Sequence, residues 1–79
     1  MTTPAITVWT NPQCVQCDAT KRRFNNDGIA YETRSIPDTP GKADEFLAAG
    51  HMQAPVVETP WVTWHGYRPD MHKWIAANA

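Results

Sequence analysis

The chain has 79 residues, of which 42% are hydrophobic and 19% charged, and its formal net charge is -1 at pH 7. This length predicts one small domain over residues 1–79, near the lower limit for burying a self-sufficient core. The nearly balanced, scattered charge argues against nucleic-acid binding, and no hydrophobic run approaches the roughly 20 residues of a membrane-spanning helix.

The first half of the chain predicts a strand, a helix and a second strand. Residues 5–10 are rich in β-branched and aromatic side chains, and Asn11-Pro12-Gln13 ends this strand. A helix from Val15 to about Asn26 contains no Pro or Gly and stops before Gly28. Residues 29–36 then predict the second strand.

The second half predicts a short helix, two strands and a final helix. The short helix is indicated by apolar residues at helical spacing (Ala43, Phe46 and Leu47), and the strands cover Pro55–Glu58 and Trp61–Trp64. The last helix starts near Pro69, and its apolar stripe is Met71, Trp74 and Ile75. Four tryptophans (Trp9, Trp61, Trp64 and Trp74) supply apolar surface for packing.

The element order β-α-β-α-β-β-α predicts an α/β fold. A helical crossover between the first two strands makes them parallel, and the short connection between the third and fourth makes an antiparallel hairpin. We therefore expect a four-stranded mixed sheet with three helices. Residues 1–4 carry neither a basic nor an apolar stretch, so we expect no secretory signal and a cytoplasmic location.

The two cysteines of the chain lie in the motif Cys14-Val15-Gln16-Cys17, between the first strand and the first helix. Residues three apart at a helix start lie roughly 5 Å apart at their Cα atoms, which a disulfide tolerates. The loop that this disulfide closes is too short to stabilise the fold appreciably. A strand, a turn, C-x-x-C and a helix are typical of a thiol–disulfide centre in a thioredoxin-like fold.

The two cysteines are expected to have different roles. Cys14 lies at the helix N-terminus, where free N–H groups and the helix dipole favour a thiolate, so it is the candidate nucleophile. Cys17, one turn inside the helix, is expected to be more buried and to attack the mixed disulfide that Cys14 forms with a partner.

A metal site is the main alternative for the cysteine pair, with inert cysteines as the remaining one. Zinc would need two further ligands from His51, His65 and His72, and the six residues between the last two exceed the usual three to five. The residues therefore favour redox chemistry and leave a small zinc-binding interaction module as an alternative. His51 and His72 are expected at the surface.

Two further segments have a plain and a functional interpretation. Pro55 is either a loop proline at the first residue of a strand or part of a cis peptide that turns residue 54 toward a partner. Arg68 and Asp70 form either an exposed ion pair or charged hydrogen bonds that tie their turn to another loop. The residues alone leave both questions open.

Over nearly its full length the chain resembles the NrdH-redoxins, small glutaredoxin-like proteins that behave functionally like thioredoxins. The resemblance rests on residues 14–21 (CVQCDATK), 53–57 (QAPVV) and 64–70 (WHGYRPD). His65 and Tyr67 stand where the family signature, W-S-G-F-R-P-D, has Ser and Phe. The Gly-Gly and acidic pair of glutathione-using glutaredoxins are absent, so no glutathione site is expected, although a glutathione-dependent glutaredoxin remains an alternative.

The resemblance implies a protein electron carrier with no bound cofactor or metal. Its partners would be class Ib ribonucleotide reductase, to which it donates electrons, and thioredoxin reductase, which recharges it from NADPH; we expect a monomer. Pro55 would be cis, and placing it beside the cysteines predicts a partner-facing surface of Pro12, Val15, Gln16, Ala54 and Pro55. A hydrogen-bond network between the last helix and neighbouring loops would include Trp64, Gly66, Arg68 and Asp70.

Overall fold

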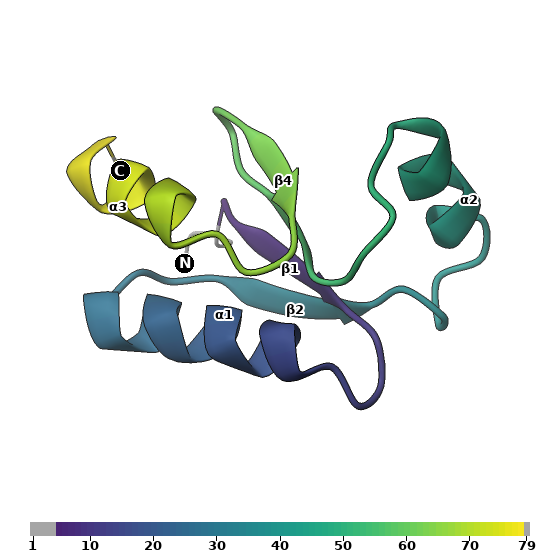
Figure 1. The fold of residues 1–79 in the computed structure, drawn as a ribbon, viewed down its shortest axis with the longest axis horizontal. Coiled ribbons are helices and arrows are strands. Elements are labelled where there is room, and N and C mark those ends of the chain that lie inside the picture. Colours follow the sequence, from purple (N-terminus) through teal and green to yellow (C-terminus); the bar gives the residue numbers. More distant parts are fainter. Residues whose placement is uncertain (1–4, 79) are drawn as a thin grey trace.

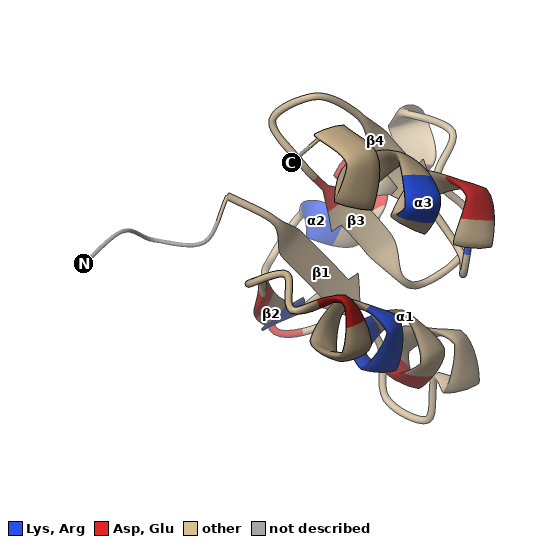
Figure 2. Cartoon of the chain, turned by 90° about the vertical axis from the view of Figure 1, so that its left-hand side faces the viewer, with Lys and Arg blue, Asp and Glu red and all other residues tan. Residues whose placement is uncertain are grey.

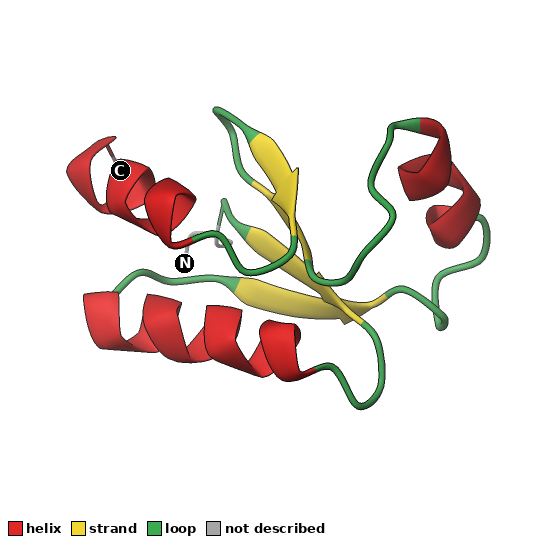
Figure 3. Cartoon of the chain, in the orientation of Figure 1, coloured by secondary structure: helices red, strands yellow, loops and turns green. Residues whose placement is uncertain are grey.

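The computed structural model describes residues 5–78 and contains, within that range, a four-stranded mixed sheet and three helices (Figures 1 and 3). The expectation about a secretory signal concerns residues 1–4 and lies outside the described residues. The elements are β1 (Thr7–Thr10), α1 (Val15–Asp27), β2 (Glu32–Ser35), α2 (Lys42–Ala48), β3 (Val56–Glu58), β4 (Thr63–His65) and α3 (Pro69–Asn78). The predicted order of elements is confirmed.

The sheet has the strand order β2-β1-β3-β4, with β1 and β3 at its centre. β1 runs parallel to β2, with Val8 opposite Thr33, and antiparallel to β3, with Val8 opposite Val57. β3 and β4 form the predicted antiparallel hairpin, in which Val57 pairs with Trp64. The parallel βαβ unit and the hairpin are both confirmed, and this topology is that of a thioredoxin-like fold.

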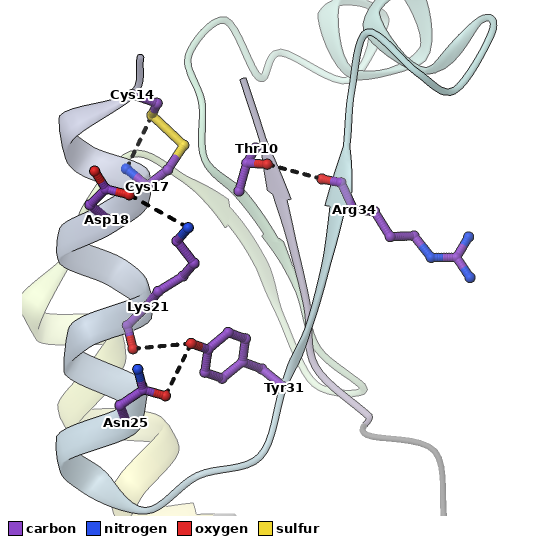
Figure 4. A network of polar contacts seen from close by, with 8 residues as sticks. All are labelled: Thr10, Cys14, Cys17, Asp18, Lys21, Asn25, Tyr31 and Arg34. Carbon is purple, nitrogen blue, oxygen red and sulfur yellow. Dashed lines mark hydrogen bonds and ion pairs between the residues drawn. A yellow bond between two sulfur atoms is a disulfide. The ribbon is translucent and has the colours of Figure 1, made fainter. Parts of the chain in front are cut away.

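β2 begins later than residue 29, where the sequence pattern placed it. Gly28 takes a left-handed conformation with φ of 68° and ends α1, and the N–H of Ile29 still donates to the carbonyl of Phe24 at 3.0 Å. The Tyr31 hydroxyl then donates to the carbonyl of Lys21 and to Asn25 Oδ1, at 3.4 Å and 3.0 Å (Figure 4). Residues 29–31 are therefore held against α1 before the chain joins the sheet.

β4 also begins later than expected, at Thr63 instead of Trp61. The Thr59 hydroxyl oxygen accepts the N–H groups of Trp61 and Val62, at 3.2 Å and 2.9 Å. These bonds fold residues 59–62 into a turn, which leaves the Trp61 side chain 49% exposed. Its ring lies edge-on to that of Trp74, which is 39% exposed, so two of the four tryptophans pack on each other at the surface.

Helices cover both faces of the sheet. On one face, apolar residues of the strands pack against Phe24 of α1 and Ile75 of α3; on the other, Trp9 and Val56 pack against Phe46 of α2. Successive strand residues point to opposite faces, which is why neighbours such as Val56 and Val57 belong to different clusters. Figure 1 shows α1 and α3 on one side of the sheet and α2 on the other.

Two histidines are less exposed than predicted. His72 is fully buried, with its ring 4.5 Å from that of Phe24, and His51 is half-buried against Phe46. The buried face of α3 contains His72 and Ile75, three positions apart, while Trp74 lies toward its exposed side. Of the predicted apolar stripe, Met71 and Ile75 pack in the core as expected, whereas Trp74 is 39% exposed and His72 takes a buried position that its polarity did not predict.

Charged residues of both signs are interspersed on the helices (Figure 2). In α1, Lys21 Nζ lies 3.5 Å from Asp18 Oδ1, and Arg23 Nε lies 3.1 Å from Asp27 Oδ2.

None of the helices in residues 5–78 combines the length and apolar character that a membrane crossing requires.

Candidate active site: a disulfide at the start of α1

The two cysteines form a disulfide at the first turn of α1 (Figure 4). Their Cα atoms are 5.2 Å apart, which matches the roughly 5 Å expected from helix geometry. Cys17 is only 2% exposed, whereas Cys14 is half-buried. Cys17 is therefore the more buried residue of the pair, as expected, and the role of Cys14 as the attacking sulfur stays a prediction.

Backbone geometry at the start of α1 places Cys14 as the helix N-cap. Gln13 has a positive φ of 56°, which is uncommon for a residue other than glycine. The chain turns sharply there, and the next residue, Cys14, is the N-cap of α1. Cys14 Sγ accepts the N–H of Cys17 at 3.1 Å, and the carbonyl of Cys14 accepts the N–H of Asp18. In the reduced protein the same N–H group and the helix dipole would stabilise a Cys14 thiolate.

The loop that precedes β3 contains the predicted cis peptide between Ala54 and Pro55. Pro55 is buried, and its carbonyl accepts the N–H of Gly66 at 2.8 Å, just beyond β4. Ala54 and Asn11 line one hollow on the surface, so the loop that leads to the cysteines and the loop of the cis peptide lie side by side. Of the predicted partner-facing residues, Pro12, Val15 and Gln16 are exposed, Ala54 is half-buried and Pro55 is buried.

A turn after β4 connects this loop to α1. The N–H of Tyr67 donates to Gln16 Oε1 at 3.0 Å. A Cβ atom on Gly66 would lie 3.1 Å from the same oxygen and 3.4 Å from Gln53 Oε1, so the side chains of Gln16 and Gln53 both reach over this glycine. The active-site helix and the cis-peptide loop therefore meet at residues 66–67. Apart from the turn at Gly66, no sequence pattern predicts this contact.

Arg68 and Asp70 form the exposed ion pair that was one of the two interpretations, and not the bonds to other loops that the family resemblance implied. The two side chains bond each other, Nε to Oδ1 at 3.1 Å and Nη2 to Oδ2 at 2.8 Å, and both are largely exposed. The Arg68 guanidinium holds the pKa of Asp70 below its usual range. Because both groups lie at the start of the same helix, this ion pair does not tie the segment to another part of the fold. The N–H groups of Gly66 and Tyr67 make those connections, to Pro55 and to Gln16 of α1.

His51 and His65 contact each other through their ring nitrogens, with the two Nδ1 atoms 3.0 Å apart. This pair was not predicted; its only signal was that His65 departs from the signature of the resembled family. Within residues 5–78, no three His, Cys, Asp or Glu side chains gather closely enough to hold a metal ion. His72 belongs to a separate cluster, with Phe24, Trp64 and Tyr67 around it.

In the described part of the chain, four buried side-chain atoms have no hydrogen-bond partner: Thr20 Oγ1, Trp64 Nε1 and both ring nitrogens of His72. They come from α1, β4 and α3. Burial lowers the pKa of His72, and the positive charge of Arg23 lowers it further. Burial therefore favours the neutral form of the His72 ring, a buried polar group that the sequence patterns did not predict.

The fold and the disulfide together define a thiol–disulfide oxidoreductase of the thioredoxin-like class. Residues 6–59 match the model of the glutaredoxin family. The glutaredoxin-like protein NrdH of Salmonella typhimurium is 42% identical over 67 residues, which cover 85% of this chain and 83% of that protein. The chain therefore belongs to the glutaredoxin family, in its group of NrdH-like redoxins.

Solved structures agree with this assignment. The NrdH-redoxin of Escherichia coli superimposes with a TM-score of 0.83 at 40% identity, covering 89% of this chain and 92% of that one. A glutaredoxin of Archaeoglobus fulgidus superimposes with a TM-score of 0.72 over 96% of this chain and 88% of its own, but at 17% identity. The second likeness concerns the fold alone.

Proposed function

We propose that this protein donates electrons to a class Ib ribonucleotide reductase and is itself reduced by thioredoxin reductase with electrons from NADPH. The observation that carries the proposal is the asymmetry of the cysteine pair, with Cys14 accessible at the helix cap and Cys17 buried behind it. The likeness to NrdH proteins supports the choice of partners, since the E. coli relative is described as having a thioredoxin-like activity profile.

The reaction proceeds by two thiol–disulfide exchanges. The Cys14 thiolate attacks one sulfur of the partner's disulfide, which forms a mixed disulfide and releases the other sulfur as a thiolate that takes up a proton. Cys17 then loses its proton and attacks Cys14 Sγ, which releases the second partner sulfur and closes the Cys14–Cys17 disulfide. Two electrons pass to the partner, and the reductase returns two electrons to the cysteine pair.

The partner is proposed to bind on the surface around Cys14, formed by Pro12, Val15, Gln16 and Ala54. Pro55, which was predicted to belong to this surface, is buried, so its proposed part is limited to the cis bond that orients Ala54. Val15 supports this assignment, because its apolar side chain is 81% exposed beside the disulfide. The shared hollow of Asn11 and Ala54 brings the two loops of this surface together. An extended peptide segment that contains the partner's cysteine would lie across them.

The remaining expectations belong to the same proposal. The chain is proposed to act as a single-domain monomer over residues 1–79, without a bound cofactor or metal, and to work in the cytoplasm. The likeness to NrdH proteins supports these assignments, and paired cysteines in that reducing compartment are typically redox-active.

NADPH consumption tests the proposed electron source. Purified protein is incubated with thioredoxin reductase, NADPH and a class Ib ribonucleotide reductase whose activity depends on an external dithiol. We expect NADPH oxidation and deoxyribonucleotide formation that both require the protein and disappear in Cys14→Ser. Reduction by glutathione and glutathione reductase, with no reaction with thioredoxin reductase, would instead identify a glutathione-dependent glutaredoxin.

A further inference from the structure

The contact between His51 and His65 has no part in the cysteine chemistry described above. Their Nδ1 atoms are 3.0 Å apart, a normal hydrogen-bond distance, and both side chains are half-buried. One Nδ1 must carry the proton and donate while the other accepts, so at least one ring is neutral in this arrangement. The bond joins the segment after α2 to the last residue of β4, which are 14 positions apart in the chain.

The backbone of each histidine is held in place by its own surroundings, and the His51 ring also packs on a neighbour. The N–H of His51 donates to the carbonyl of Phe46 at 2.8 Å, and its ring lies edge-on to the Phe46 ring with centroids 6.2 Å apart. His65 is fixed by the sheet, where it pairs with Val56. The contact therefore connects two supports whose backbones are fixed by hydrogen bonds, α2 and the β3–β4 hairpin.

The chain between these supports is the loop 52–55, which carries Ala54 and the cis peptide. His51 begins this loop, and the carbonyl of Pro55 ends it by accepting the N–H of Gly66. Because His65 and Gly66 are consecutive, both attachments hold the loop to the same end of β4. Met52 and Gln53, between the attachments, are exposed, so the position of Ala54 depends on the bonds at the two ends of the loop and on its own packing against the cluster of Trp9 and Phe46.

We propose that His51 and His65 form a clip that positions the loop 52–55 for binding of the partner's cysteine-containing segment. The two histidines are positioning residues and do not touch the reacting sulfurs. The inference rests on the proposed function only in taking this loop as part of the partner-binding surface. It also gives a role to His65, which replaces the serine of the resembled signature.

Reduction of insulin, with dithiothreitol as the electron source, tests the clip on a protein disulfide. His51→Phe keeps a ring against Phe46 but removes the nitrogen, so we expect KM for insulin to rise about three- to tenfold with kcat little changed, as loss of a neutral hydrogen bond would predict. His51→Asn places a polar atom where Nδ1 lies and is expected to restore most of the affinity. The reaction of each reduced variant with hydroxyethyl disulfide should proceed at the wild-type rate.

A second variant and a double mutant separate the clip from a general loss of structure. His65→Ala removes the other partner and should raise KM for insulin similarly, and His51→Phe/His65→Ala should be no worse than either single variant. An unchanged KM in both single variants, additive effects in the double mutant, or an equal slowing toward hydroxyethyl disulfide would overturn the proposal. Neither thioredoxin reductase nor ribonucleotide reductase enters this assay, so failure of the proposed partners would not affect its outcome.

Discussion

Gln16 and Tyr67 are joined by a hydrogen bond across 51 positions of the chain, in which the Tyr67 N–H donates to Gln16 Oε1 at 3.0 Å. Gln16 lies between the two cysteines, so this bond connects the turn after β4 directly to the active-site segment. Gly66 lies next to it, and a Cβ atom there would come within 3.1 Å of the same oxygen. A side chain at Gly66 would therefore have to push the Gln16 oxygen away slightly, which would strain this hydrogen bond.

Replacing Gly66 by alanine should destabilise the fold more than the same change at Gly28. Both glycines have positive φ, 76° and 68°, so both substitutions cost about 1–2 kcal/mol of backbone strain. A Cβ atom at Gly28 meets nothing within 4 Å, whereas at Gly66 it displaces Gln16. Urea melts of the two variants measure the difference in the free energy of unfolding. Equal losses would show that the Gln16 contact does not contribute to stability.

The two cysteines should be distinguishable by single substitutions. Cys14→Ser removes the accessible sulfur and should abolish disulfide reduction, while Cys17→Ser should attack once and accumulate a mixed disulfide with its partner. Non-reducing gel electrophoresis after incubation with an oxidised partner protein measures the trapped complex. If Cys14→Ser traps the partner through Cys17 and the reverse variant does not, the assigned roles are exchanged.

His72 should make the fold sensitive to acid. Burial lowers its pKa, so the unfolded chain binds a proton at higher pH than the folded protein does. The stability associated with neutral His72 is fully present above its ordinary pKa of about 6.5 and is lost as pH falls below that value toward the folded pKa.

Substitution of His72 by leucine tests this linkage. His72→Leu removes two buried nitrogens without partners, so we expect unfolding free energy at pH 7 to rise by about 1–2 kcal/mol. The stability difference between variant and wild type should widen as pH falls from 7 to 5. A constant difference across that range, measured by urea melts at each pH, would contradict the assignment of a buried neutral ring.

Arg68→Ala should have little effect on stability. Its partner Asp70 is on the same helix turn and both groups are exposed, so water replaces the ion pair when the guanidinium is removed. We expect the urea midpoint and the rate of insulin reduction to stay close to wild type, with Lys73→Ala on the same helix as an exposed-cation control. A large loss of stability in Arg68→Ala alone would mean that Arg68 does reach a neighbouring loop.

The local features of the site follow from the sequence by itself. The spacing of Cys14 and Cys17 and the helix start between them determine a Cα separation near 5 Å, because both depend only on neighbouring residues. The alternation of strand residues and the order of elements likewise determined the parallel unit and the hairpin. The cis form of Pro55 was one of two alternatives on the residues alone and was predicted only through the family resemblance.

Tertiary structure decided the contacts between distant segments. The strand order brings β4 beside β3, which places His65 against His51 and puts Gly66 and Tyr67 next to Gln16. The packing of α3 on Phe24 buries His72, although its polarity predicted exposure. The periodicity of the sequence indicates which face of a helix or strand is apolar. The partners of a polar side chain depend instead on which elements become neighbours, and the packing of the sheet and helices decides those neighbours.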